Sequence, residues 1–138
     1  LGPVYQAGTL SGNPVAMSAG LAAMNIISRE GFYEPLFQRT QAICEGMQAA
    51  ANKAGVPFTT NHLGTMFGGF FTEDAKVTEY SQVINSDTAA FSRFFHSMLD
   101  AGVYLAPASF EAGFMSSAHT DADIDATIAA AASAFAAL

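Results

Sequence analysis

The run VYQAGTLSGNPVAM (residues 4–17) has residue types that could bind an anion. Small and hydroxyl-bearing residues precede a proline and an apolar segment. A glycine-rich segment that leads into a helix presents free N–H groups and the positive end of the helix dipole, and a hydroxyl adds a further donor. Phosphate would suit such a site. Alternatively, Ser11 or Asn13 simply caps the helix, and the pattern alone leaves both interpretations open.

A second candidate is Glu111 in the run SFEAGF (residues 109–114). Phe110 and Phe114 flank this carboxylate, with only small residues beside it. If the loop folds inward, the apolar surroundings would raise the pKa of the Glu111 carboxyl group, which could then act as a tuned acid. If the loop faces solvent, Glu111 is an ordinary surface residue.

The remaining candidates for metal or covalent chemistry are weak. Acidic and imidazole groups alternate at His119, Asp121, Asp123 and Asp125. An EF-hand loop starting at Asp121 would need glycine at position 126 and an acid at position 132, but both are alanine. Carboxylates at a helix start explain the pattern better. His62 and His96 have no partner at ligand spacing, so no metal site is predicted.

The chain contains two lysines, Lys53 and Lys76, and one cysteine, Cys44. Lys53 stands near a helix end and Lys76 in a polar stretch, so neither has the desolvated setting of a Schiff-base lysine. Cys44 cannot form an internal disulfide, and its neighbours predict a buried helical face. These features favour a reducing, cytoplasmic location.

Composition limits the class of partner. The chain has 138 residues, of which 51% are apolar and 12% charged, with a net charge of −7. The length fits one domain, and the negative charge disfavours nucleic-acid binding. The low charge predicts that some apolar surface is covered by a partner or by a further domain. The apolar run at 126–138 is too short for a membrane span, and Leu1 is expected to follow a cut inside a longer protein.

The elements that must position these residues follow from periodicity and turn signals. We predict helices over 13–29 and 33–54, which pair with each other, and strands within 56–61 and 64–72. Gly68 and Gly69 predict a bulge or a close approach by another backbone. A polar surface stretch (73–85), a helix (87–101), a strand (103–106), a loop (107–119) and a helix from Thr120 complete an α+β fold in the order ααββαβα.

Three stretches together resemble one family: residues 2–17, GTMFGGFFT at 64–72, and GVYLAPASFEAGFMSSAH at 102–119. They are similar to the C-terminal part of glutamate-1-semialdehyde 2,1-aminomutase, a class III, fold-type I enzyme that uses pyridoxal 5'-phosphate (PLP) and its pyridoxamine form. The resemblance implies conversion of glutamate 1-semialdehyde to 5-aminolevulinate for tetrapyrrole synthesis. It also implies a segment leading from a large domain (1–31) and a small domain (32–138).

The resemblance also implies roles for individual residues. Gly8 and Thr9 would donate to the phosphate of the cofactor bound by the other subunit of a homodimer, and Glu111 would lie near the substrate and help to discriminate substrates. In the family the lysine, aspartate and aromatic residue that serve the cofactor precede the part matching Leu1. We therefore expect no catalytic residue in this chain, no activity and no bound cofactor. Alternatives are another class III aminotransferase, acting on an amine or ω-amino acid, and a non-catalytic oligomerising domain.

Overall fold

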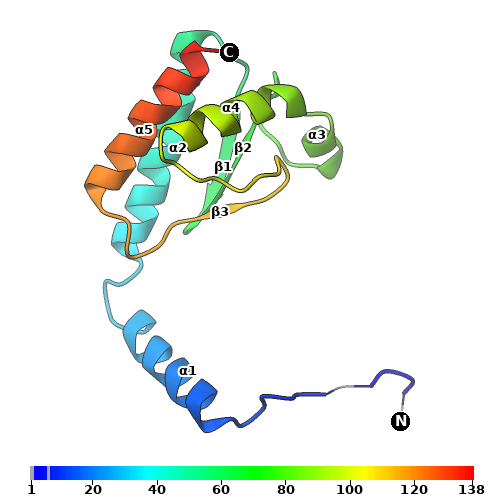
Figure 1. Ribbon diagram of the computed structural model, residues 1–138, viewed down its shortest axis with the longest axis vertical. Coiled ribbons are helices and arrows are strands. Elements are labelled where there is room, and N and C mark those ends of the chain that lie inside the picture. Colours follow the sequence, from blue (N-terminus) through cyan, green and yellow to red (C-terminus); the bar gives the residue numbers. More distant parts are fainter. Residues whose placement is uncertain (1, 6) are drawn as a thin grey trace. The chain divides into compact units, whose positions relative to one another are not determined.

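The computed structural model describes residues 2–5 and 7–138, and it divides into two compact units, Leu1–Tyr33 and Glu34–Leu138. In the first unit a turn-rich segment leads into helix α1 (Pro14–Ile27) (Figure 1). Proline at the first helical position and Asn13 at the N-cap start this helix as predicted. No residue of α1 is buried, and its apolar side chains are exposed, among them Val15, Met17, Leu21 and Met24.

The second unit places helices on a short antiparallel sheet, which confirms the predicted α+β class (Figure 1). Its elements are α2 (Glu34–Ala54), β1 (Thr59–Leu63), β2 (Met66–Phe70), α3 (Tyr80–Ile84), α4 (Thr88–Asp100), β3 (Gly113–Phe114) and α5 (Asp121–Ala136). The strand order is β1-β2-β3. Helix α5 packs along α2, α2 also contacts β1, and α4 packs against α5.

Helix α2 has the predicted amphipathic pattern, and its partner is α5. Leu36, Ile43 and Met47 recur at helical spacing and are buried. Gly46 lets the helices approach, because a Cβ there would lie 2.5 Å from Cδ1 of Ile128 in α5. The partner expected from sequence, α1, belongs to the other unit. Among the described residues, no helix combines the length and hydropathy that a membrane crossing requires.

Four buried phenylalanines form the centre of the core. The ring centroids of Phe94 and Phe135 are 4.5 Å apart, and Phe58 lies 4.9 Å from Phe135 and 5.1 Å from Phe71. Edge-to-face and tilted contacts at such distances stabilise aromatic pairs beyond the area they bury. These rings come from α4, α5 and the two ends of the hairpin, so the cluster joins elements far apart in sequence.

The β1–β2 hairpin is regular, which corrects the bulge expected at its glycines. Leu63 pairs with Met66 across a two-residue turn, and Gly64 adopts φ 61°, as the first position of such a turn requires. The register continues without interruption from Thr60–Gly69 to Asn61–Gly68. A Cβ on Gly69 would lie 2.6 Å from the Phe58 ring. The close neighbour is therefore an aromatic side chain and not another backbone.

The third strand is Gly113–Phe114 and not the predicted stretch 103–106. Val103 uses its amide to close the end of α4, donating to the carbonyl of Met98 at 2.8 Å. The edge of β2 is instead occupied by β3, with Met66 paired to Phe114. The polar stretch 73–85 also contains a short helix, α3, that the predicted element order lacked.

Candidate functional site

The turn before α1 contains the predicted anion-binding residues. The amide of Ser11 donates to the carbonyl of Gly8 at 2.9 Å, and the amide of Asn13 donates to that of Leu10 at 3.1 Å. Asn13 Oδ1 accepts hydrogen bonds from the amides of the second and third helical residues, at 3.0 and 3.1 Å. The capping role considered for Ser11 or Asn13 thus belongs to Asn13.

Because Asn13 occupies the donors at the helix end, any anion must be held by the turn itself. No hydrogen bond joins the amide or hydroxyl of Thr9 to any residue that the structure describes, and Thr9 is exposed. Gly8 stands where a Cβ would overlap the Ser11 hydroxyl. A compact turn that has no Cβ at position 8 and carries N–H and O–H donors at Thr9 fits a phosphate group chemically.

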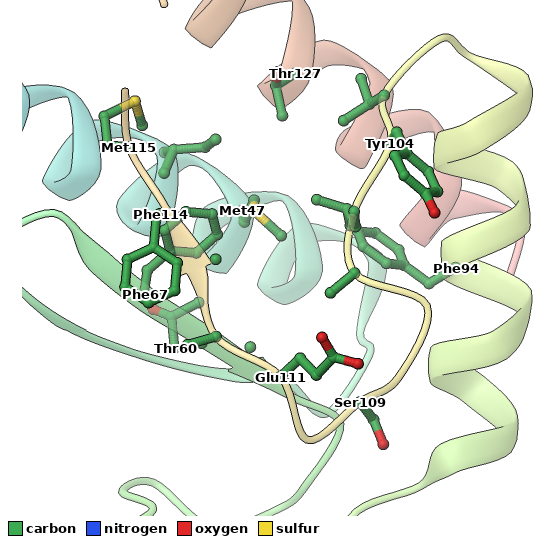
Figure 2. A pocket seen from close by; sticks show the side chains of 18 of the residues that line it. Met47, Thr60, Phe67, Phe94, Tyr104, Ser109, Glu111, Phe114, Met115 and Thr127 are labelled. Atoms are coloured by element: carbon green, nitrogen blue, oxygen red, sulfur yellow. The ribbon is translucent and has the colours of Figure 1, made fainter. Parts of the chain in front are cut away.

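The second unit contains a partly open cavity of about 240 Å³ beneath the segment 103–115 (Figure 2). Its walls come from α2, the hairpin, α4 and α5, and they are mainly apolar. The lining includes Met47, Phe58, Thr60, Phe67, Phe71, Phe94, Tyr104, Glu111, Phe114, Met115, Ile124 and Thr127. The cavity therefore lies where all layers of the unit meet.

Glu111 lies at this cavity, with its carboxylate on the side that faces the lining residues (Figure 2). It is nevertheless exposed, as are Phe110 and Phe114, with 53% and 65% of their surface accessible. The expected apolar enclosure of Glu111 by these two rings is therefore absent. The carboxylate of Glu111 makes no hydrogen bond or ion pair with any residue in the described part of the chain.

The segment that carries Glu111 is attached to the sheet just after this residue. Gly113 pairs with Phe67, and the amide of Met115 donates to the carbonyl of Thr65 at 2.8 Å. A Cβ on Gly113 would lie 2.4 Å from Cζ of Phe67, so the ring covers a position that only glycine leaves open. This contact fixes where the segment leaves the sheet.

The polar residues just before α5 and in its first turn serve structural roles. Thr120 and Asp123 form a reciprocal capping box, and their hydrogen bonds lower the pKa of the Asp123 carboxyl group. Asp121 accepts a hydrogen bond from Arg39 Nε at 2.7 Å, and Nδ1 of His119 accepts one from the Ser116 amide. Within the described residues, no three His, Cys, Asp or Glu side chains are grouped as metal ligands.

The lysines and the cysteine lie in opposite environments. Lys53 and Lys76 are exposed. Cys44 is 2% exposed, and burial raises the pKa of its thiol to about 11, an effect that a hydrogen bond with Thr60 lowers in part and the Glu45 carboxylate reinforces. Such a thiol is inert at neutral pH.

Several cavity residues have no local signal in the sequence. Thr60 lies in β1, Tyr104 in the segment between α4 and β3, and Thr127 in α5, so they line one cavity only through tertiary packing. The helical spacing of Met47 predicts a core residue as well as it predicts a cavity-lining one. The runs at 64–72 and around Glu111 are the parts of the sequence that could have indicated this region.

The model of the family "Aminotransferase class-III" matches residues 1–131. Similar solved structures include an omega-transaminase from Sphaerobacter thermophilus (24% identity, TM-score 0.77, covering 96% of this chain and 30% of that one). A second is the PLP internal aldimine form of the FumI protein from Sphingopyxis sp. MTA144 (24% identity, TM-score 0.78, covering 98% of this chain and 30% of that one). A third is a β-phenylalanine aminotransferase from Variovorax paradoxus (25% identity, TM-score 0.78, covering 96% of this chain and 30% of that one). The chain thus spans about 30% of the length of these proteins.

Proposed function

Because this chain belongs to the class-III aminotransferase family, we propose that it is the C-terminal portion of a PLP-dependent glutamate-1-semialdehyde 2,1-aminomutase. The observation that carries the proposal is the set of three stretches at 2–17, 64–72 and 102–119. In the fold the second and third contribute neighbouring strands, β2 and β3, and both line the cavity where Glu111 lies. The proximity of the second and third stretches within the second unit supports the proposal.

The N-terminal turn would supply part of the phosphate site. The Thr9 amide and hydroxyl make no hydrogen bond with any described residue, and Gly8 leaves its position in the turn without a Cβ. We propose that these groups bind the phosphate of the cofactor held by the other subunit of a homodimer. When bound, PLP supplies the electron sink that allows an amino group to move between carbons. Helix α1 follows this turn in the sequence, and its exposed apolar side chains support the proposal that another subunit packs there.

Glu111 would act on the substrate side. Its carboxylate is unpaired within the described residues, so it can accept a hydrogen bond from a polar group of the substrate and disfavour molecules with a carboxylate at that point. Catalytic residues proper are proposed to lie in the rest of the protein, because Lys53 and Lys76 are exposed. The lone, buried Cys44 agrees with the proposed cytoplasmic location.

A transaminase acting on an amine or ω-amino acid is the second candidate. It is favoured by the similarity to an omega-transaminase and to a β-phenylalanine aminotransferase. A non-catalytic oligomerising domain is the third, and the exposed apolar residues of α1 would suit it as well.

The requirement for a keto acid separates the two enzymes. The complete protein is supplied either with glutamate 1-semialdehyde alone or with a primary amine together with pyruvate or 2-oxoglutarate. In the first case 5-aminolevulinate is measured, and in the second the amino acid formed from the keto acid. An aminomutase forms 5-aminolevulinate without a keto acid, because substrate and product are isomers and no net acceptor of the amino group is needed. Activity that appears only with a keto acid and an amine donor would favour the transaminase, and no activity in any combination would favour the non-catalytic domain.

A further inference from the structure

The segment between α4 and β3 is attached to the rest of the second unit at its two ends. At its start the amide of Val103 closes the end of α4. Over residues 105–112, the one hydrogen bond made with any described residue is internal to the segment, from the Glu111 amide to the carbonyl of Ala108 at 3.3 Å. The position of Glu111 therefore depends on the next attachment along the chain, which is Gly113 in β3.

Strand β3 is too short for its hydrogen bonds alone to fix its register. It pairs with β2 at two positions, Met66 with Phe114 and Phe67 with Gly113. A slip of one residue would move the strand by about 3.3 Å and turn its side chains to the opposite face of the sheet. Such a slip would also draw Glu111 away from its place at the cavity.

At the place that the Phe67 ring covers, glycine is the residue that fits. A Cβ on Gly113 would overlap the tip of the ring, at 2.8 Å from both Cε1 and Cε2. Its two neighbours, Ala112 and Phe114, both carry a Cβ, and no other glycine occurs within 103–138. A slip in either direction would therefore press a side chain against the ring. An aromatic ring over a cross-strand glycine is a known means of fixing register.

We propose that Phe67 and Gly113 are positioning residues for Glu111. The ring and the glycine together set the register of β3, and the register sets where the Glu111 carboxylate lies at the cavity (Figure 2). In this role neither residue acts on the substrate itself. The inference rests on the proposed function of Glu111 beside the substrate, but the register is measured without any substrate.

NMR of the 138-residue chain measures the register of β3. Met66 and Phe114 face each other beside the 2.8 Å hydrogen bond that the Met115 amide donates to the hairpin turn. In such a pair the α-carbons are about 4.5 Å apart, so the two α-protons give a strong NOE. Gly113→Ala should abolish this NOE. The control Gly68→Ala should keep it, because this position of β2 has no partner in β3.

The ring is tested from the other strand. Phe67→Ala should weaken the same NOE, and adding Gly113→Ala to it should change nothing further, because no ring is left for the new methyl group to overlap. The methyl signal of the fully buried Met98 shows whether each variant is folded, and Gly113→Ala decides alone if Phe67→Ala is unfolded. An NOE that persists in Gly113→Ala, or a double variant worse than Phe67→Ala, would overturn the proposal.

Kinetics of the complete protein test the link to Glu111, with whichever reaction, aminomutation or transamination, the protein catalyses. Gly113→Ala should raise KM about tenfold with little change in kcat, but by about twofold or less in a Glu111→Gln background, where the displaced carboxylate is already absent. Equal effects in both backgrounds would contradict a positioning role. A protein that catalyses neither reaction would refute the proposed function instead, and the NOE would still decide the register.

Discussion

Asn13 and Thr9 have different roles in the N-terminal turn. Asn13 uses its side chain to satisfy two amides of α1, so the helix end contributes less to an anion site than its glycine-rich sequence suggests. Thr9 keeps both of its donors available. Sequence could predict both roles but could not assign them, because a cap and an anion site use the same residue types and differ only in which N–H group is already bonded.

Substitution of Thr9 by valine removes one donor while keeping the shape of the side chain. In the complete protein, Thr9→Val should weaken PLP binding by roughly 1–3 kcal/mol, as expected for loss of a hydrogen bond to a charged group. The dissociation constant of PLP is measured by equilibrium dialysis, with free PLP quantified by its fluorescence. The unfolding midpoint of the 138-residue chain alone should not change, and an unaltered PLP dissociation constant would show that the Thr9 hydroxyl does not bind the phosphate.

Cys44 makes the stability of the chain depend on pH in the alkaline range. The pKa of its thiol rises in the folded state from an ordinary value of 9.0 to about 11. Between these values the unfolded chain loses the thiol proton and the folded chain keeps it, so the free energy of unfolding falls as pH rises. Well below pH 9 the thiol is protonated in both states and has no such effect.

The comparison of the wild-type chain with Cys44→Ala isolates this contribution. Other groups titrate equally in both proteins, so the difference in their unfolding free energies should shift against the wild type by about 1–1.5 kcal/mol between pH 8 and pH 10. Urea unfolding at a series of pH values measures it. A difference that stays constant over this range would mean that the thiol is not desolvated.

At the scale of elements, local signals predicted the helices and missed part of the sheet. Asn13, one of the two caps considered, begins α1, and Asp87 and Thr120 cap α4 and α5 at the positions where those helices were predicted to begin. Capping involves residues only two or three positions apart, so it leaves a local signal. The prediction of a strand at 103–106 was wrong, because strand pairing depends on residues far apart in the sequence. Gly113 could take the edge of β2 under the ring of Phe67, a contact that composition and alternation do not reveal.

The two neighbouring glycines of β2 should respond differently to alanine. At Gly69 the new methyl group would press on Phe58, which is fixed in the aromatic core, so Gly69→Ala should lower the free energy of unfolding by about 1–3 kcal/mol. Gly68→Ala is the matched control on the same strand, since its Cβ would lie 3.2 Å from the Phe70 ring tip, in a half-buried side chain that can move. Chemical denaturation measures both, and equal effects would contradict the packing described.

For the whole molecule, two features explain the apolar composition. The second unit buries a conventional aromatic core. The first unit exposes apolar side chains along α1, which supports the expectation from composition that further protein covers this surface. The family and the α+β class were predictable from motifs and periodicity, whereas the cavity was not, because its lining is assembled from every layer of the second unit.

The central claim is that this chain supplies residues around the cofactor and substrate while the lysine that binds the cofactor lies elsewhere in the protein. The most direct test adds PLP to the 138-residue chain and to the complete protein, reduces both with borohydride, and maps pyridoxyl-lysine by peptide mass spectrometry. We predict no stoichiometric label in the chain alone, and in the complete protein one labelled lysine outside these 138 residues. Specific labelling of Lys53 or Lys76 in either protein would contradict the account.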